Sequence, residues 1–99
     1  MPAPTRSVIG IAWYRPEGYL RLAELMADGA SFPKTYASWR QKALRMAREL
    51  KRQGATPVRI EIEPEAFQRW CIGEGVATDS GARNRYVKEV LAGQPVLKD

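Results

Sequence analysis

Residues 58–71 read VRIEIEPEAFQRWC, and their periodicity changes halfway along the stretch. The first six residues alternate between apolar and charged side chains, which predicts a strand with one buried face. From Pro64 onward, Phe67, Trp70 and Cys71 recur at helical spacing and predict a short helix that ends at the glycines 73 and 75. Pro64 suits the first helical position, where its missing N–H is not needed. The stretch therefore predicts a strand that leads directly into a helix.

Part of this stretch occurs twice in the chain. EPEAFQR begins at Glu63, and RPEGYLR begins at Arg15, 48 positions earlier, after an apolar run at 8–14. That run predicts a strand covered on both faces. We interpret the repeated phrase as a helix start, with proline in the first turn and glutamate at the positive end of the helix dipole. A pair of symmetry-related sites built on Glu17 and Glu65 is the weaker alternative.

Three more helices follow from apolar periodicity and capping residues. The helix that starts at Pro16 is expected to stop in a left-handed turn at Gly29. Thr35 is a candidate N-cap for the longest helix, which ends at Gly54. A last helix is expected to start at Thr78 or Asp79 and to end at the glycine at 93.

The predicted fold is a single α+β domain over residues 7–93, built from a duplicated β-α-α unit in the order β-α-α-β-α-α. The halves span 7–54 and 55–93, and residues 1–6 and 94–99 are expected to be loose tails. With two helices between the strands, the chain would reverse direction three times from one strand to the next, so we expect two antiparallel strands. The four helices are expected mainly on one face of this sheet, which dimerisation would extend.

The first strand has two apolar faces, and the sequence gives conflicting signs about their orientation. Alignment of the two halves assigns the inward role to three residues, namely Gly10, Ala12 and Tyr14. Bulk alone would place Ile9, Ile11 and Trp13 inward instead. Because an exposed apolar face usually marks an interface, we predict that Ile9, Ile11 and Trp13 form the interface of a homodimer.

Positive charge is concentrated in one segment. The net charge is +5, and residues 34–59 contain eight basic residues and one acidic residue, a net charge of +7. On a helical wheel, one arc opposite the apolar stripe holds four polar side chains: Gln41, Arg45, Arg48 and Arg52. Arginines at this spacing are suited to contact successive phosphates of a nucleic acid. The alternative is a solvated face whose charges pair with the acidic residues that follow, such as Glu61 and Glu63.

The chain lacks the residues that most classes of catalytic site require. The chain contains no histidine, and its one cysteine, Cys71, cannot form a zinc knuckle or a redox pair. No phosphate-binding glycine motif is complete, since Thr78 occupies the third glycine position of GxGxxG. Glu61, Glu63 and Glu65 are better explained as a solvated strand face than as metal ligands. We therefore predict no catalytic residue, no metal and no cofactor.

The apolar run at 8–14 is too short to span a membrane and is not followed by a small-residue cleavage site. A single cysteine at a helical core position suits a reducing compartment. We expect a cytoplasmic protein with no membrane partner.

Three phrases, IGIAWYRPEGY (9–19), TYASWRQKA (35–43) and VRIEIEPEAFQRWC (58–71), resemble those of a family of small uncharacterised bacterial proteins. The resemblance covers most of the chain from Val8 to Leu91. It implies a fold of this kind and brings no activity, cofactor or catalytic residue. One departure is Ser38, which stands where an acidic capping residue is expected.

Three functional classes remain. The first is a non-catalytic interaction or regulatory module that acts as a homodimer with a protein partner the sequence does not identify. The second is a nucleic-acid-associated protein that uses Gln41, Arg45, Arg48 and Arg52 on the basic helix at 36–53. The third is a small-ligand-binding or enzyme domain.

Overall fold

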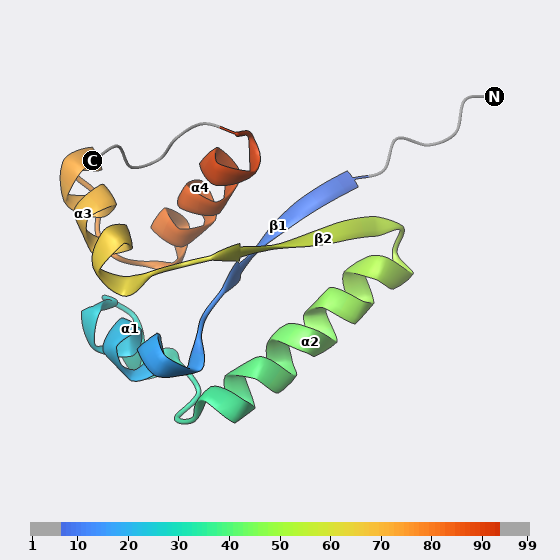
Figure 1. Ribbon diagram of the computed structural model, residues 1–99, viewed down its shortest axis with the longest axis horizontal. Coiled ribbons are helices and arrows are strands. Elements are labelled where there is room, and N and C mark those ends of the chain that lie inside the picture. The colour runs from blue at the N-terminus through green and yellow to red at the C-terminus, as the bar shows by residue number, and fades with distance from the viewer. Residues whose placement is uncertain (1–6, 94–99) are drawn as a thin grey trace.

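The computed structural model describes residues 7–93, and the tails predicted at 1–6 and 94–99 lie outside this range (Figure 1). The elements follow in this order: β1 (Ser7–Trp13), the 3₁₀ turn η1 (Pro16–Gly18), α1 (Tyr19–Leu25), the 3₁₀ turn η2 (Gly29–Ser31), α2 (Tyr36–Arg52), β2 (Ala55–Glu61), α3 (Pro64–Glu74) and α4 (Ser80–Leu91). The α+β class and the predicted order of strands and α-helices are confirmed.

The two strands are parallel, so the predicted antiparallel sheet is wrong. β1 pairs with β2 in a register that runs from Ser7 opposite Ala55 to Trp13 opposite Glu61. The reason is the length and position of α1, which has only seven residues and packs beside α3 beyond the end of the sheet. Only α2 runs back along the strands, so β2 starts at the same end as β1 (Figure 1).

Helices cover both faces of the sheet. Trp13 packs edge-on against Trp39 of α2, with ring centroids 5.0 Å apart. On the other face, a Cβ added to Gly10 would lie 2.5 Å from Cγ1 of Val87 in α4. Side chains of neighbouring strand residues alternate between faces, so α2 and α4 lie on opposite sides. The expectation that the helices lie mainly on one face is therefore wrong.

The main core lies on the α4 side and is closed by α1 and α3. Its most deeply buried side chains are Tyr19, Leu22, Phe67 and Cys71. Both strands contribute one alternating set to this core: Tyr14, Ile60 and Ile62 are buried within it, and Ala12 and Val58 are partly buried against it. The inward set derived from the alignment of the two halves is thus confirmed.

The register pairs residues that are 48 positions apart, which is also the spacing of the repeated phrase. Both phrases therefore leave the sheet side by side at the same end. The helices that follow differ, however, because α1 and α2 have 7 and 17 residues, whereas α3 and α4 have 11 and 12. A duplicated β-α-α unit stays a prediction.

Local signals set most helix ends. Thr35 caps α2 by accepting a hydrogen bond from the Ser38 N–H (3.1 Å). Asp79 caps α4, while the Thr78 hydroxyl donates to the carbonyl of Leu25 and ties α4 to the end of α1.

Three boundaries differ from the prediction. The helix expected to start at Pro16 begins with the 3₁₀ turn η1, so α1 itself starts at Tyr19. β2 begins at Ala55, because Pro57 is accommodated in an edge strand and does not form part of a turn. Gly29 has no left-handed backbone, since positive φ angles among residues 7–93 occur only at the glycines 54, 75 and 93. Gly29 is needed because an added Cβ would lie 1.9 Å from the carbonyl oxygen of Ala23.

Candidate functional site

The basic face of α2 comprises Gln41, Arg45, Arg48 and Arg52, and all four side chains are exposed. The opposite side of the helix carries Ala43, which is buried, and Trp39, which packs against Trp13. The structure therefore brings the four predicted nucleic-acid-binding residues together on the side of α2 that points away from the sheet.

Little negative charge lies near this face. Glu49 is the only acidic residue between 34 and 59, and it forms an ion pair with Arg52 (2.7 Å) on the same helix. Hydrogen bonds from Arg52, and then from Gln53, lower the pKa of Glu49. Arg45 and Arg48 form no ion pair with another residue in the range 7–93.

The acidic residues that follow α2 are engaged elsewhere. Glu61 pairs with Arg15 (3.1 Å), and Glu74 pairs with Arg85. Glu61 and Glu74 therefore form no ion pair with α2, and the alternative is wrong where it assigns them this role. The basic face keeps most of its positive charge.

The three predicted interface residues are separated by the structure. Ile11 is buried, and Trp13 contacts both Trp39 and the guanidinium of Arg59, whose Cζ is 4.1 Å from the Trp13 ring centroid. α2 therefore covers these two residues within the chain itself. Ile9 remains 37% exposed.

The repeated phrases meet at a cleft of about 370 Å³ at the carboxyl ends of both strands. Its charged lining consists of Arg15, Glu17, Arg21, Glu63 and Glu65. Ligands of open parallel sheets often bind at this end of the strands, so the cleft is a candidate site by position. Glu17 and Glu65, on which the alternative of two symmetry-related sites was based, thus line the same cleft.

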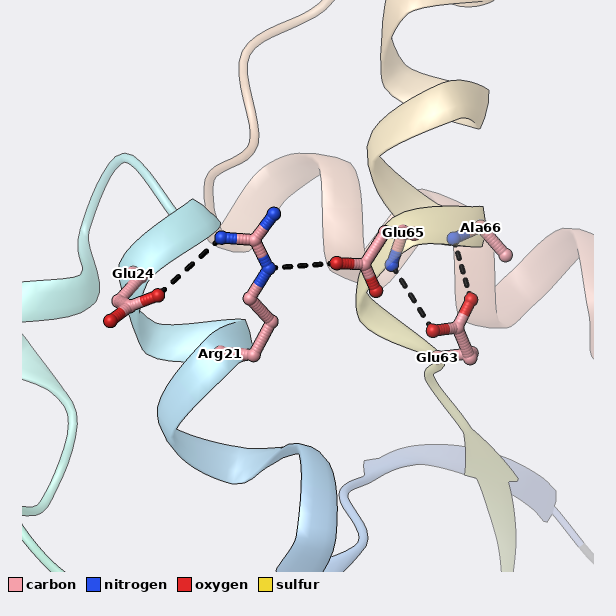
Figure 2. A network of polar contacts seen from close by, with 5 residues as sticks. All are labelled: Arg21, Glu24, Glu63, Glu65 and Ala66. Carbon is pink, nitrogen blue, oxygen red and sulfur yellow. Dashed lines mark hydrogen bonds and ion pairs between the residues drawn. The ribbon is translucent and has the colours of Figure 1, made fainter.

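Ion pairs and caps occupy the charged groups on the α3 side of the cleft (Figure 2). Arg21 Nε donates to Oε2 of Glu65 (2.7 Å), and its Nη1 lies 3.5 Å from Oε1 of Glu24. Glu63 caps α3 by accepting hydrogen bonds from the N–H groups of Ala66 (2.8 Å) and Glu65 (3.3 Å). These contacts join α1 to α3 and hold the start of α3 in place.

Two titratable side chains of α3, Glu65 and Cys71, have shifted pKa values. The hydrogen bond from Arg21 lowers the pKa of Glu65, so this carboxylate stays ionised. The chain has no histidine, and Cys71 lies buried in the core, where burial raises the pKa of its thiol. Within residues 7–93 there is no group of three or more potential metal ligands. The arrangement fits a structural junction between two helix starts.

A smaller cavity of about 240 Å³ lies beside the partly buried ion pair of Asp28 and Arg83. Arg83 Nη1 and Nη2 donate to the two carboxylate oxygens of Asp28 at 2.9 and 2.7 Å. Tyr14 and Phe32 also line this cavity, and burial raises the pKa of Tyr14.

Sequence reasoning missed this pair, although a signal existed. Arg83 lies four residues before Val87 and three before Tyr86, so it occupies the inward side of α4. A charge on an inward stripe requires a partner. The identity of that partner, Asp28, depends on contacts across 55 positions.

Comparisons of the chain with protein-family models, with curated proteins and with solved structures give no match. No helix within residues 7–93 has the length and apolar character needed to cross a membrane.

Proposed function

We propose that this chain is a non-catalytic cytoplasmic binding module that acts as a homodimer and contacts the phosphate backbone of nucleic acid with α2. The observation that carries the proposal is the exposed arc of Arg45, Arg48 and Arg52, which has one acidic neighbour, Glu49. The absence of histidine and the buried position of Cys71 support a non-catalytic role.

The dimensions of α2 suit a backbone contact. Arg45 and Arg52 are about 10 Å apart along the helix axis, which equals about three nucleotides of one strand at 3.4 Å each. Arginine presents several N–H donors to a phosphate in a fixed fork geometry. Nothing in this arc distinguishes one base from another, so we expect binding that depends on charge and not on sequence.

Fluorescence anisotropy of labelled duplex DNA and hairpin RNA at about 50 and 200 mM salt tests the proposal. Three or four phosphate contacts predict a fall in affinity of about 40- to 150-fold over this range for a single chain, and a larger fall for a dimer that binds through both chains. Binding at the lower salt is expected to disappear in the triple variant Arg45→Ala, Arg48→Ala, Arg52→Ala.

A matched variant separates the effect of the basic face on binding from the effect of the net charge. Lys34→Ala, Arg69→Ala and Lys88→Ala remove three exposed basic side chains outside the arc. This control is expected to retain binding within about threefold, because the arc remains complete. Equal losses in both triple variants, or no binding by the wild type at 50 mM salt, would contradict the proposal.

Dimerisation has its own supporting observation. Val8 and Ile9 leave apolar surface exposed on β1, at 51% and 37% of their full areas. A sheet of two strands has no inner strand, and association with a further strand would shield this surface. Sedimentation equilibrium of the wild type at about 100 μM checks this part, and a folded monomer there would contradict it.

A further inference from the structure

β1 has one edge without a strand neighbour, and this edge lacks the features that usually protect such edges. β1 pairs only with β2 within residues 7–93. Edge strands commonly contain charged residues, proline or a bulge that oppose further pairing. Residues 7–13 read SVIGIAW and contain neither a charge nor a proline, whereas β2 contains Pro57, Arg59 and Glu61. The two edges of the sheet thus differ, and only that of β1 is open to pairing.

Exposed apolar side chains accompany the open edge. Val8 and Ile9 are neighbours on β1, so their side chains lie on opposite faces of the sheet. Apolar surface is therefore available beside the edge on both faces.

We infer that β1 pairs antiparallel with β1 of a second copy, which gives a four-stranded sheet in the order β2-β1-β1-β2. This inference rests on the proposed homodimer and names its surface. A strand that pairs antiparallel with its own copy satisfies the self-complementarity of a twofold interface. Because β1 carries no charge, no like charges oppose each other across the new pair. These two conditions favour a second copy over a charged peptide of another protein.

The size of the surface predicts a dimer of moderate strength. A seven-residue strand is about 23 Å long. The side of the molecule at this edge is about 20 Å thick, because a helix layer lies about 10 Å from the sheet on each face. This gives roughly 450 Å² per copy, about half of what a standard interface buries on each partner. We therefore expect dissociation at micromolar concentrations.

The same geometry would set the arrangement of the two basic faces. The twofold axis of antiparallel edge pairing is perpendicular to the sheet, so each face of one copy continues into the same face of the other. Both α2 helices would then lie on one side of the extended sheet, each above its own β2. Three strand spacings, about 14 Å, would separate them. The dimer would present two arcs of arginines to one nucleic acid and would double the number of phosphate contacts.

The test compares the wild type with Val8→Lys, Ile9→Lys in sedimentation equilibrium from about 5 to 200 μM, without nucleic acid. Both positions are exposed in the single chain, so the variant is expected to fold and to sediment as a monomer, since charge at an edge opposes pairing. The control Leu20→Lys, Ile72→Lys changes two exposed apolar residues, at 68% and 74%, that lie on α1 and α3. We expect this control to remain a dimer.

If circular dichroism shows that the double variant is misfolded, the single variant Val8→Lys takes its place in the test. It is expected to weaken dimerisation at least tenfold with an unchanged spectrum. A dimer that both lysine variants of β1 leave intact would overturn the edge interface while the homodimer stands. A monomeric wild type would overturn both.

Nucleic-acid binding provides a separate readout. The slope of log affinity against log salt is expected to fall by about half in the monomeric variant, because each bound unit then holds one α2. If the wild type is a dimer that fails to bind DNA and RNA, the proposed function is wrong and the edge interface is still supported. If dimer and monomer show equal slopes, the placement of both α2 helices on one side is wrong.

Discussion

Gly29 shows how one residue permits a close approach that the sequence does not reveal. Its backbone is not left-handed, yet an added Cβ would lie 1.9 Å from the carbonyl oxygen of Ala23. The contact is with backbone, which cannot move aside as a flexible side chain can. The segment that follows α1 therefore packs closely against α1 because residue 29 has no side chain.

Gly29→Ala is expected to lower the free energy of unfolding by about 3 kcal/mol through overpacking. Gly73→Ala is the matched control, because Gly73 lies inside α3 with no heavy atom within 4 Å of an added Cβ. That change is expected to stabilise the protein by about 0.5–1 kcal/mol, because alanine is the better helix former. Urea unfolding measures both, and equal effects would show that the contact at Gly29 is absent.

The ion pair of Asp28 and Arg83 is unequally buried, with side-chain exposures of 33% and 10%. Removal of the carboxylate leaves a buried guanidinium without its partner, whereas removal of the guanidinium leaves a carboxylate that water reaches. Asp28→Ala is therefore expected to cost about 3 kcal/mol and Arg83→Met about 1 kcal/mol. Urea unfolding at pH 7 gives the order, and a larger loss in Arg83→Met would contradict it.

The same pair predicts a pH dependence. Hydrogen bonds from Arg83 lower the pKa of Asp28 in the folded state. A depressed folded pKa stabilises the protein fully above the unfolded value of about 3.9 and progressively less as the pH falls through the folded pKa. The stability difference between the wild type and Asp28→Asn should therefore shrink below about pH 4. A difference that stays constant from pH 7 to pH 2.5 would contradict this role.

At the scale of elements, capping residues define where helices begin. Thr35 accepts a hydrogen bond from the Ser38 N–H, and no acidic residue lies in the first turn of α2 to share this role. Thr35→Ala is expected to cost about 1 kcal/mol, while Thr35→Ser retains the hydroxyl and should cost less than about half of that. Urea unfolding measures both changes, and similar losses would assign the effect to the methyl group of Thr35.

Prediction from sequence succeeds for elements whose signals are local. The alternation at 58–63, the stripe of Phe67, Trp70 and Cys71, and the cap at Thr35 all lie within a few residues of what they determine. The alternating pattern predicts the start of β2 three residues late, because Pro57 is typical of turns, although an edge strand tolerates it. The basic face of α2 was found for the same reason, since helical spacing alone brings Arg45, Arg48 and Arg52 together.

At the scale of the whole molecule, the aromatic side chains around Trp39 and those around Trp70 form two groups that belong to one core. Trp39 contacts Tyr14 and Tyr19, and Trp70 contacts Phe67 and Tyr86. The buried residues of both groups belong to a single cluster, against which Trp39 packs. Unfolding of either group should therefore disrupt the other.

Single-tryptophan variants test this cooperativity. Trp13→Phe, Trp70→Phe keeps Trp39 as the reporter, and Trp13→Phe, Trp39→Phe keeps Trp70. In each variant, the fluorescence midpoint in urea is expected to coincide with the midpoint from circular dichroism of the same protein. Separated midpoints within either variant would show that the α2 side and the α3–α4 side unfold independently.

The sequence by itself determined the elements, their order, the inward set of the second strand and the basic arc, because these depend on periodicity and on neighbours along the chain. Tertiary structure alone decided that the strands are parallel, since this depends on α1 packing beyond the sheet and not running back along it. It also decided that Ile11 and Trp13 lie under α2, and that Arg83 pairs with Asp28. These outcomes depend on contacts between distant segments, whose free energy is available only once the whole chain is folded.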